Sequence, residues 1–269
     1  MILASAECDP AHDIICAPSD VNELFEFREA IFSLGPFPIT RTVFLILGIA
    51  VIVSAVLFFG LRKKALVPGK FQTIVESIIE FVRDGIAIEI IGEHGAKYAP
   101  WLLSIFLFVL VGNLYEVTPF INFPVTSRMA LPLMLAVITW VIFVIAGIKR
   151  QGLGYFLGIV WPKSVPMALR PLVGLIEFFS ILLLRPLTLA IRLFANLVAG
   201  HLMLTLLLVS GWVFISSVGD IGARAGIGVA WFTMGLGIYM FEIVVIMLQA
   251  YIFTLLSAVY VQTSLYPDH

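Results

Sequence analysis

The sequence predicts an all-α polytopic membrane protein with about five membrane spans and one amphipathic helix in the membrane interface. Hydrophobic residues make up 61% of the 269 residues and charged residues 12%, about half the charged fraction of a soluble domain. The mean hydropathy is +1.09. Several apolar stretches exceed the ~18–20 residues that cross a bilayer. The net charge of −1 offers no basic surface, so nucleic acid is not expected as a partner.

Two regions follow from the composition. Residues 1–40 form an acidic, irregular N-terminal segment, and residues 41–265 form a single transmembrane domain. Cys8 and Cys16 both lie in the N-terminal segment. They would pair if that segment faces an oxidising compartment, and two unpaired thiols are an equal alternative.

The first half of the transmembrane domain contains three spans. The first is 42–61, the second starts at Pro100, and the third is 130–148. Between the first two, residues 70–84 have apolar residues at helical spacing and charged residues on the opposite face. This pattern predicts an amphipathic helix that Gly85 ends. That helix is expected to lie in the interface or to touch a peripheral stalk.

The second half contains two stretches that are longer than a bilayer is thick. A Gly- and Pro-rich link leads to 166–218, and the turn at Gly219-Asp220 leads to 226–262. About 37 residues of helix reach roughly 55 Å, against a hydrocarbon core of ~30 Å. Two long, tilted, antiparallel helices are therefore expected, and a strongly tilted helix needs a partner surface.

The distribution of basic residues predicts the orientation in the membrane. Alternating spans put 62–99 and 149–171 on one side, and these loops hold ten of the sixteen lysines and arginines. Positively charged loops stay inside. The N-terminus is therefore expected outside and the C-terminus inside.

Polar residues in the two long helices fall into two groups. At ~100° per residue, Asn196 shares the face of Arg192, while His201 lies about half a turn away. Glu242 and Gln249 share one face of the last helix. In an antiparallel hairpin, if Arg192 is level with Gln249, then His201 is level with Glu242 within a turn. The spacing predicts a central Arg–Asn–Gln group and a His–Glu pair ~10–13 Å away along the helices.

Acidic groups approach the central arginine from both sides. Glu177 precedes Arg192 and lies towards the inside, whereas Glu116 lies at the outer end of the second span. A pore would show one continuous row of polar residues. This pattern predicts two half-paths interrupted by a guanidinium. Arg185, beside Pro186, is expected to extend its charge to the inner interface.

The motif "RPLTLAIRLFANLVAGHL", together with "LQAYIF", resembles subunit a of the F-type ATP synthase, and the resemblance covers roughly 60–265. The family's arginine-leucine-phenylalanine-small-asparagine run is matched by residues 192–196, and its glutamine-alanine-aromatic run by residues 249–253. One stretch departs from the family: "FPVTSRMALP" has Ser127 where many relatives carry acidic and amide groups. "TSRMALP" and "GIKRQG" are more similar to actinobacterial members.

The resemblance implies a role for each polar residue. Arg192 matches the essential arginine that faces the rotor ring's carboxylates, with Asn196 and Gln249 as its helpers. The half-channel residues of the family map to four further positions: His201, Glu242 and Glu116 on the outer side, and Glu177 on the inner side.

The resemblance also implies the setting. The chain would be the stator subunit of the proton channel in the membrane sector, non-catalytic alone, within the H⁺-transporting two-sector ATPase. Its partners would be the c-ring of rotor subunits, the b subunits of the peripheral stalk, protons and the lipid bilayer, with no cofactor or metal. A bacterial plasma membrane is expected, with the C-terminus cytoplasmic; the mitochondrial inner membrane is the alternative. Sodium in place of protons remains open.

Two other classes of protein are alternatives. An ion-coupled secondary transporter would usually show internal repeats, and none is visible. An intramembrane enzyme could use His201 and Glu242 as acid and base, but no nucleophile or set of metal ligands accompanies them.

Overall fold

The computed structural model describes most of the chain from residue 30 onward. The described residues are 15, 30–34, 37–62, 69–118, 128–152, 154–161, 166–216 and 225–266. Cys8, Cys16, Ser127 and the Gly219-Asp220 turn lie outside them.

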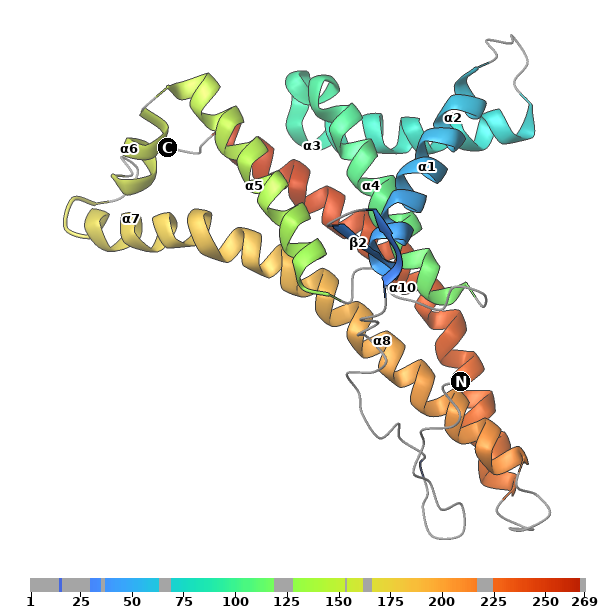
Figure 1. The fold of residues 1–269 in the computed structure, drawn as a ribbon. Coiled ribbons are helices and arrows are strands. Elements are labelled where there is room, and N and C mark those ends of the chain that lie inside the picture. The colour runs from blue at the N-terminus through green and yellow to red at the C-terminus, as the bar shows by residue number, and fades with distance from the viewer. Residues whose placement is uncertain are drawn as a thin grey trace. The chain divides into compact units, whose positions relative to one another are not determined.

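Helices dominate the described residues (Figure 1). In chain order the elements are β1 (Ala30–Leu34), β2 (Phe37–Thr40), α1 (Arg41–Leu61), α2 (Lys70–Val82), η3 (Arg83–Ile88), α3 (Glu89–Ile91), η4 (Gly92–His94), α4 (Gly95–Val117), α5 (Ala130–Gln151), α6 (Gly154–Val160), α7 (Arg170–Phe179), η6 (Ser180–Leu184), α8 (Arg185–Ser216) and α10 (Ala225–Leu265).

Five helical stretches of the described residues are long and apolar enough to cross a membrane: Thr42–Leu61, Lys70–Val117, Ala130–Gln151, Arg170–Ser216 and Gly226–Leu265. The prediction of an all-α polytopic membrane protein is therefore confirmed. The tilt of the two long helices and the outside position of the N-terminus stay predictions.

The end of the N-terminal segment is more regular than expected. Strands β1 and β2 pair antiparallel, with Ala30 opposite Thr40 and Leu34 opposite Phe37. Their residues are rich in Phe, Ile and Thr, which suit a strand. The expectation of an irregular segment is thus wrong for these residues.

The amphipathic helix continues past its predicted end. The chain stays helical through Gly85, as the π-helix η3 and then α3, and turns at Gly92, where φ is 81°. A glycine inside a helix costs only about 1 kcal/mol, so packing overrides it, whereas a positive φ favours glycine strongly. A side chain at Gly95 would strike the Ala87 carbonyl. The second span therefore begins at Gly95, against η3, rather than at Pro100.

The chain forms two compact units, which are described separately. Unit 1 comprises Met1–Leu47, Gly112–Ser127 and Ala195–Leu248, and unit 2 comprises Gly48–Val111, Arg128–Phe194 and Gln249–His269. Helices α1, α4, α8 and α10 each continue from one unit into the other.

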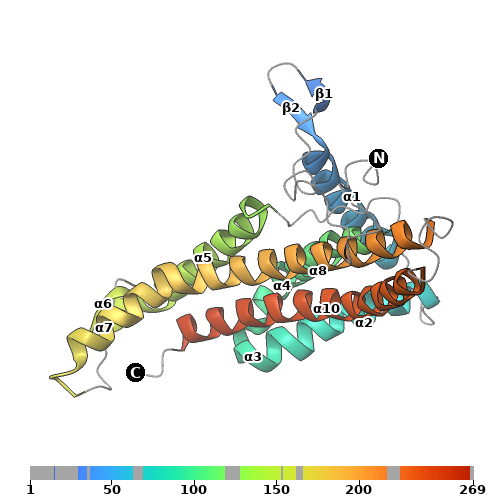
Figure 2. The same ribbon diagram turned by 90° about the horizontal axis from the view of Figure 1, so that it is seen from below.

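In unit 1, helices α8 and α10 run antiparallel and very close together (Figures 1 and 2). Four glycines mark the contact, because an added Cβ at any of them would lie 2.5–2.8 Å from the opposite helix. The facing pairs are Gly200 with Glu242, Leu208 with Gly235, Gly211 with Phe232, and Phe214 with Gly228. Each step along α8 thus matches a step back along α10 to within one residue, which confirms the predicted antiparallel pairing. Small residues permit this close approach.

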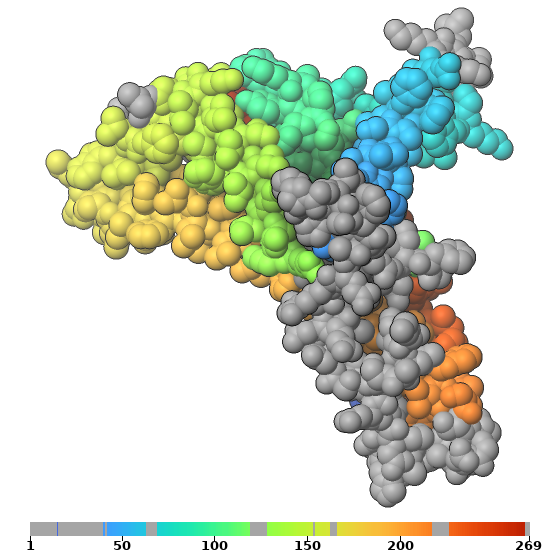
Figure 3. Space-filling model, viewed as in Figure 1, coloured from blue at the N-terminus to red at the C-terminus, as the bar shows by residue number. Residues whose placement is uncertain are grey.

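Unit 2 has a continuous apolar core built from α2, η3, α4, α5, the start of α8 and the end of α10. Phe143 of α5 and Phe253 of α10 are fully buried in it. The link after the third span, expected only to be Gly- and Pro-rich, contains the short helix α6. Its Val160 carbonyl packs directly on Gly174 of α7, and Figure 3 shows the surfaces of these two helices in contact.

Candidate functional site

Three ionisable side chains from three helices lie buried together in unit 1. Glu116 at the end of α4 is 2% exposed, and His201 of α8 and Glu242 of α10 are each 4% exposed. The His201 Nδ1 lies 3.9 Å from the Glu116 Oε1, and the two carboxyl groups are close enough to interact electrostatically. We call Glu116, His201 and Glu242 the outer cluster.

Glycine brings Glu242 into the outer cluster. The carboxyl group lies over Gly200, where an added Cβ would be 2.5 Å from the Glu242 Oε1. The end of α4 is held beside α10 by Tyr239, whose hydroxyl donates to the Val117 carbonyl at 2.7 Å. The cluster therefore depends on a glycine on α8, which leaves room for the carboxyl group, and on a hydrogen bond that anchors α4.

The outer cluster leaves carboxyl oxygens without hydrogen bonds. In the part of the chain that the structure describes, both oxygens of Glu116 and the Oε1 of Glu242 accept none. A buried ionised carboxylate without partners is costly. Such groups persist in a membrane helix when they exchange protons or ions, so the cluster can take up and pass on protons.

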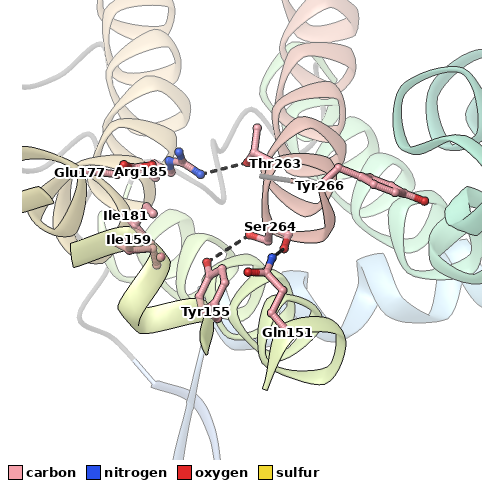
Figure 4. A pocket seen from close by; sticks show the side chains of 10 residues that line it. Gln151, Tyr155, Ile159, Glu177, Ile181, Arg185, Thr263, Ser264 and Tyr266 are labelled. Atoms are coloured by element: carbon pink, nitrogen blue, oxygen red, sulfur yellow. Dashed lines mark hydrogen bonds between the residues drawn. The ribbon is translucent and has the colours of Figure 1, made fainter. Parts of the chain in front are cut away.

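Unit 2 holds a second polar site, an open cavity of about 160 Å³. Figure 4 shows its lining, with Glu177, Ile181 and Arg185 on one side and the end of α10 on the other. Two hydrogen bonds fix Ser264 in its wall: the Gln151 Nε2 donates to the Ser264 carbonyl at 3.0 Å, and the Tyr155 hydroxyl lies 3.3 Å from the Ser264 Oγ. We call this the inner cavity.

Arg185 contributes to the inner cavity instead of only reaching for the interface. Its Nη1 donates to the Thr263 Oγ1 at 3.1 Å, and its guanidinium lies 5.4 Å from the centre of the Tyr260 ring. Both partners belong to the end of α10. The charge of Arg185 thereby ties the start of α8 to α10 and lies in the same cavity as Glu177.

The three residues of the predicted central group belong to two different units. In unit 2, Arg192 is exposed on the surface of α8, and Gln249 of α10 is 6% exposed, with its Nε2 making no hydrogen bond to the described residues. In unit 1, Asn196 is half-buried, and its Nδ2 likewise has no partner in the described parts of the chain. An exposed guanidinium inside a span long enough to cross a membrane needs a partner of opposite charge.

The sequence reasoning missed most of the inner cavity. Gln151, Tyr155 and Ser264 are ordinary residues at helix ends, and only the tertiary fold gathers them. Glu177 and Arg185 were the two signals available, as charged residues in an apolar run. Among the described residues, no group of three His, Cys, Asp or Glu side chains could hold a metal ion.

Comparison with known proteins gives one consistent family. The family model described as "ATP synthase A chain" matches residues 42–262. The chain belongs to the ATP synthase subunit a family. A relative named "ATP synthase subunit a" from Frankia alni is 42% identical over 214 residues, which are 79% of this chain and 72% of the relative. The relative of that name from Streptomyces lividans is 42% identical over 229 residues, 83% of this chain and 78% of its own.

A third bacterial relative extends the match. The protein of the same name from Nocardioides sp. is 36% identical over 252 residues, which are 92% of this chain and 88% of the relative. The predicted family is therefore confirmed, and with it a multi-pass membrane protein that belongs to the ATP synthase. Membership in this family also favours the subunit a interpretation over a secondary transporter or an intramembrane enzyme.

Proposed function

We propose that this chain is the stator subunit of the ATP synthase proton channel in a bacterial plasma membrane, with its C-terminus cytoplasmic. It provides two offset half-channels, and Arg192 between them couples proton passage to rotation of the c-ring. The outer cluster lines one half-channel and Glu177 in the inner cavity lines the other. The peripheral stalk b subunits hold the chain still.

One observation carries the proposal: two carboxyl groups and an imidazole are buried together where three apolar helices meet. A structural role is a poor explanation, because apolar residues of similar volume stabilise a buried site as well or better. Along the chain, Arg192 follows the cavity residue Arg185 and precedes His201. On the helical stretch from α7 to α8, a fixed cation thus lies between the cavity residues and His201 in chain order.

The coupling step follows from the cost of charge in lipid. A rotor carboxylate must be neutral to face lipid. Beside Arg192 it is ionised, because a nearby cation lowers a carboxyl pKa by ~1–3 units. The guanidinium stays charged at every accessible pH, which blocks a direct proton shortcut. A membrane potential supplies ~2.3 kcal/mol per charge per 100 mV, which biases the direction of rotation.

Substitution of Arg192 tests the proposal in membrane vesicles that contain the whole synthase. In Arg192→Ala and Arg192→Lys, we expect ATP synthesis driven by a proton gradient to fall to background, because lysine can lose its charge on burial. Arg83→Ala is the control, since the Arg83 side chain is exposed and, among the described residues, is hydrogen-bonded only to its neighbour Asp84, at 2.8 and 3.1 Å. Normal coupled synthesis in Arg192→Ala would refute the proposal. Repeating the assay with and without sodium identifies the ion.

A further inference from the structure

A π-helical turn interrupts the helix between Glu177 and Arg192. In η6, the N–H of Arg185 donates to the Ser180 carbonyl, five residues back. The next donor in that series would be residue 186, and its acceptor would be the Ile181 carbonyl. Residue 186 is proline, which has no N–H. Ile181 is 9% exposed, so its carbonyl would be left buried without a partner, which is costly.

A tryptophan from another helix supplies the missing donor. The indole Nε1 of Trp140, on α5, donates to the Ile181 carbonyl at 3.0 Å. Trp140 is half-buried, and both residues belong to unit 2. The side chain therefore satisfies the Ile181 carbonyl, for which Pro186 provides no π-turn donor, and it joins α5 to the π-turn between α7 and α8.

The π-turn also decides which residues line the inner cavity. Eight residues of regular α-helix would rotate Arg185 about 80° away from Glu177. A π-turn takes one more residue into its turn, which offsets most of that rotation. Glu177, Ile181 and Arg185 accordingly line the same side of the cavity (Figure 4). A relaxed, α-helical segment would turn one of the two charges away.

We propose that Trp140 is a positioning residue: its indole N–H stabilises the π-turn at Ser180–Leu184, and the turn holds Glu177 and Arg185 together in the inner cavity. The effect on proton passage rests on the function proposed above. The effect on helix geometry does not rest on it, so the two are measured separately.

The geometry is measured with nitroxide labels at positions 172 and 191, which are exposed on α7 and α8, in a Cys8→Ser/Cys16→Ser background. The complete synthase is used in lipid nanodiscs. In Trp140→Phe we expect the distance distribution to shift or broaden. Proton passage is measured as passive proton uptake by vesicles stripped of the catalytic head. We expect it to fall roughly threefold to tenfold, the order set by the net loss of one hydrogen bond.

Two further variants separate the hydrogen bond from the loss of ring volume. Trp101→Phe is the matched control, because the Trp101 indole nitrogen is buried and has no hydrogen-bond partner among the described residues; it should change neither measurement. Pro186→Ala supplies a backbone donor. Added to Trp140→Phe, it should restore the distances and bring proton uptake back to within about twofold, since the carbonyl is satisfied again.

Unchanged distances in Trp140→Phe would overturn the inference. The inference would also be overturned if adding Pro186→Ala to Trp140→Phe did not restore the label distances. If Trp140→Phe alone does not assemble, the same test applies to assembly, which Pro186→Ala must then restore. Glu177→Gln distinguishes the two proposals. If that variant conducts protons normally, the inner half-channel of the proposed function fails, while the label distances still decide the role of Trp140.

Discussion

Replacing Gly200 with alanine should disrupt the outer cluster by displacing Glu242. The new methyl carbon would lie 2.5 Å from the Glu242 Oε1 and 2.7 Å from its Cδ, whereas non-bonded carbons rest at about 3.5–4.0 Å. The carboxyl group must therefore move by about 1 Å. Overpacking of this kind costs typically 1–3 kcal/mol. Each 1.4 kcal/mol is a factor of ten in an equilibrium, so proton uptake should slow about fivefold or more.

The measurement compares three variants of the whole synthase by passive proton uptake in stripped vesicles. Gly237→Ala is the matched control on the same hairpin, because an added Cβ there meets nothing within 4 Å; it should conduct normally. Glu242→Asp shortens the side chain by one methylene, so adding it to Gly200→Ala should recover part of the loss. If Gly200→Ala takes up protons at the wild-type rate, the assignment of Glu242, as packed closely on α8, to the proton path is refuted.

Two hydrogen-bonded contacts give further predictions. Tyr239→Phe removes the donor to the Val117 carbonyl, so the synthase should lose about 1 kcal/mol of stability and conduct protons more slowly; an unchanged melting temperature in detergent would contradict this. Arg185→Gln removes the cation–π contact with Tyr260 and weakens the bond to Thr263, a loss of about 1–2 kcal/mol. Its proton uptake should fall while Arg185→Lys keeps more of it, and equal rates in the two variants would argue against a role for the charge.

The relative level of polar residues in the hairpin could be predicted because antiparallel helices follow simple geometry. Placing Arg192 level with Gln249 puts His201 level with Glu242, and the structure has Glu242 against Gly200, one residue away. The prediction needs only a constant rise per residue. It holds because glycines keep the two helices in close contact along unit 1.

The third member of the outer cluster could not be predicted in the same way. Helical periodicity says which residues share a face, but not which other helix packs against that face. Glu116 lies 3.9 Å from His201, and α4 is anchored there by the hydrogen bond from Tyr239 to the Val117 carbonyl, a contact between residues far apart in the chain. The π-turn could not be predicted from the sequence either, because Pro186 alone is compatible with the start of an ordinary helix.

The composition of the outer cluster itself argues for proton exchange. Two carboxyl groups and one imidazole are each at least 96% buried. If both carboxylates were ionised, one imidazolium could neutralise only one of them, and an uncompensated buried charge is prohibitive. The three groups must therefore hold at least one proton in addition to the proton that charges His201. This additional proton needs no fixed position. Three buried groups that share protons are what the proposed half-channel requires and what a purely structural contact would avoid.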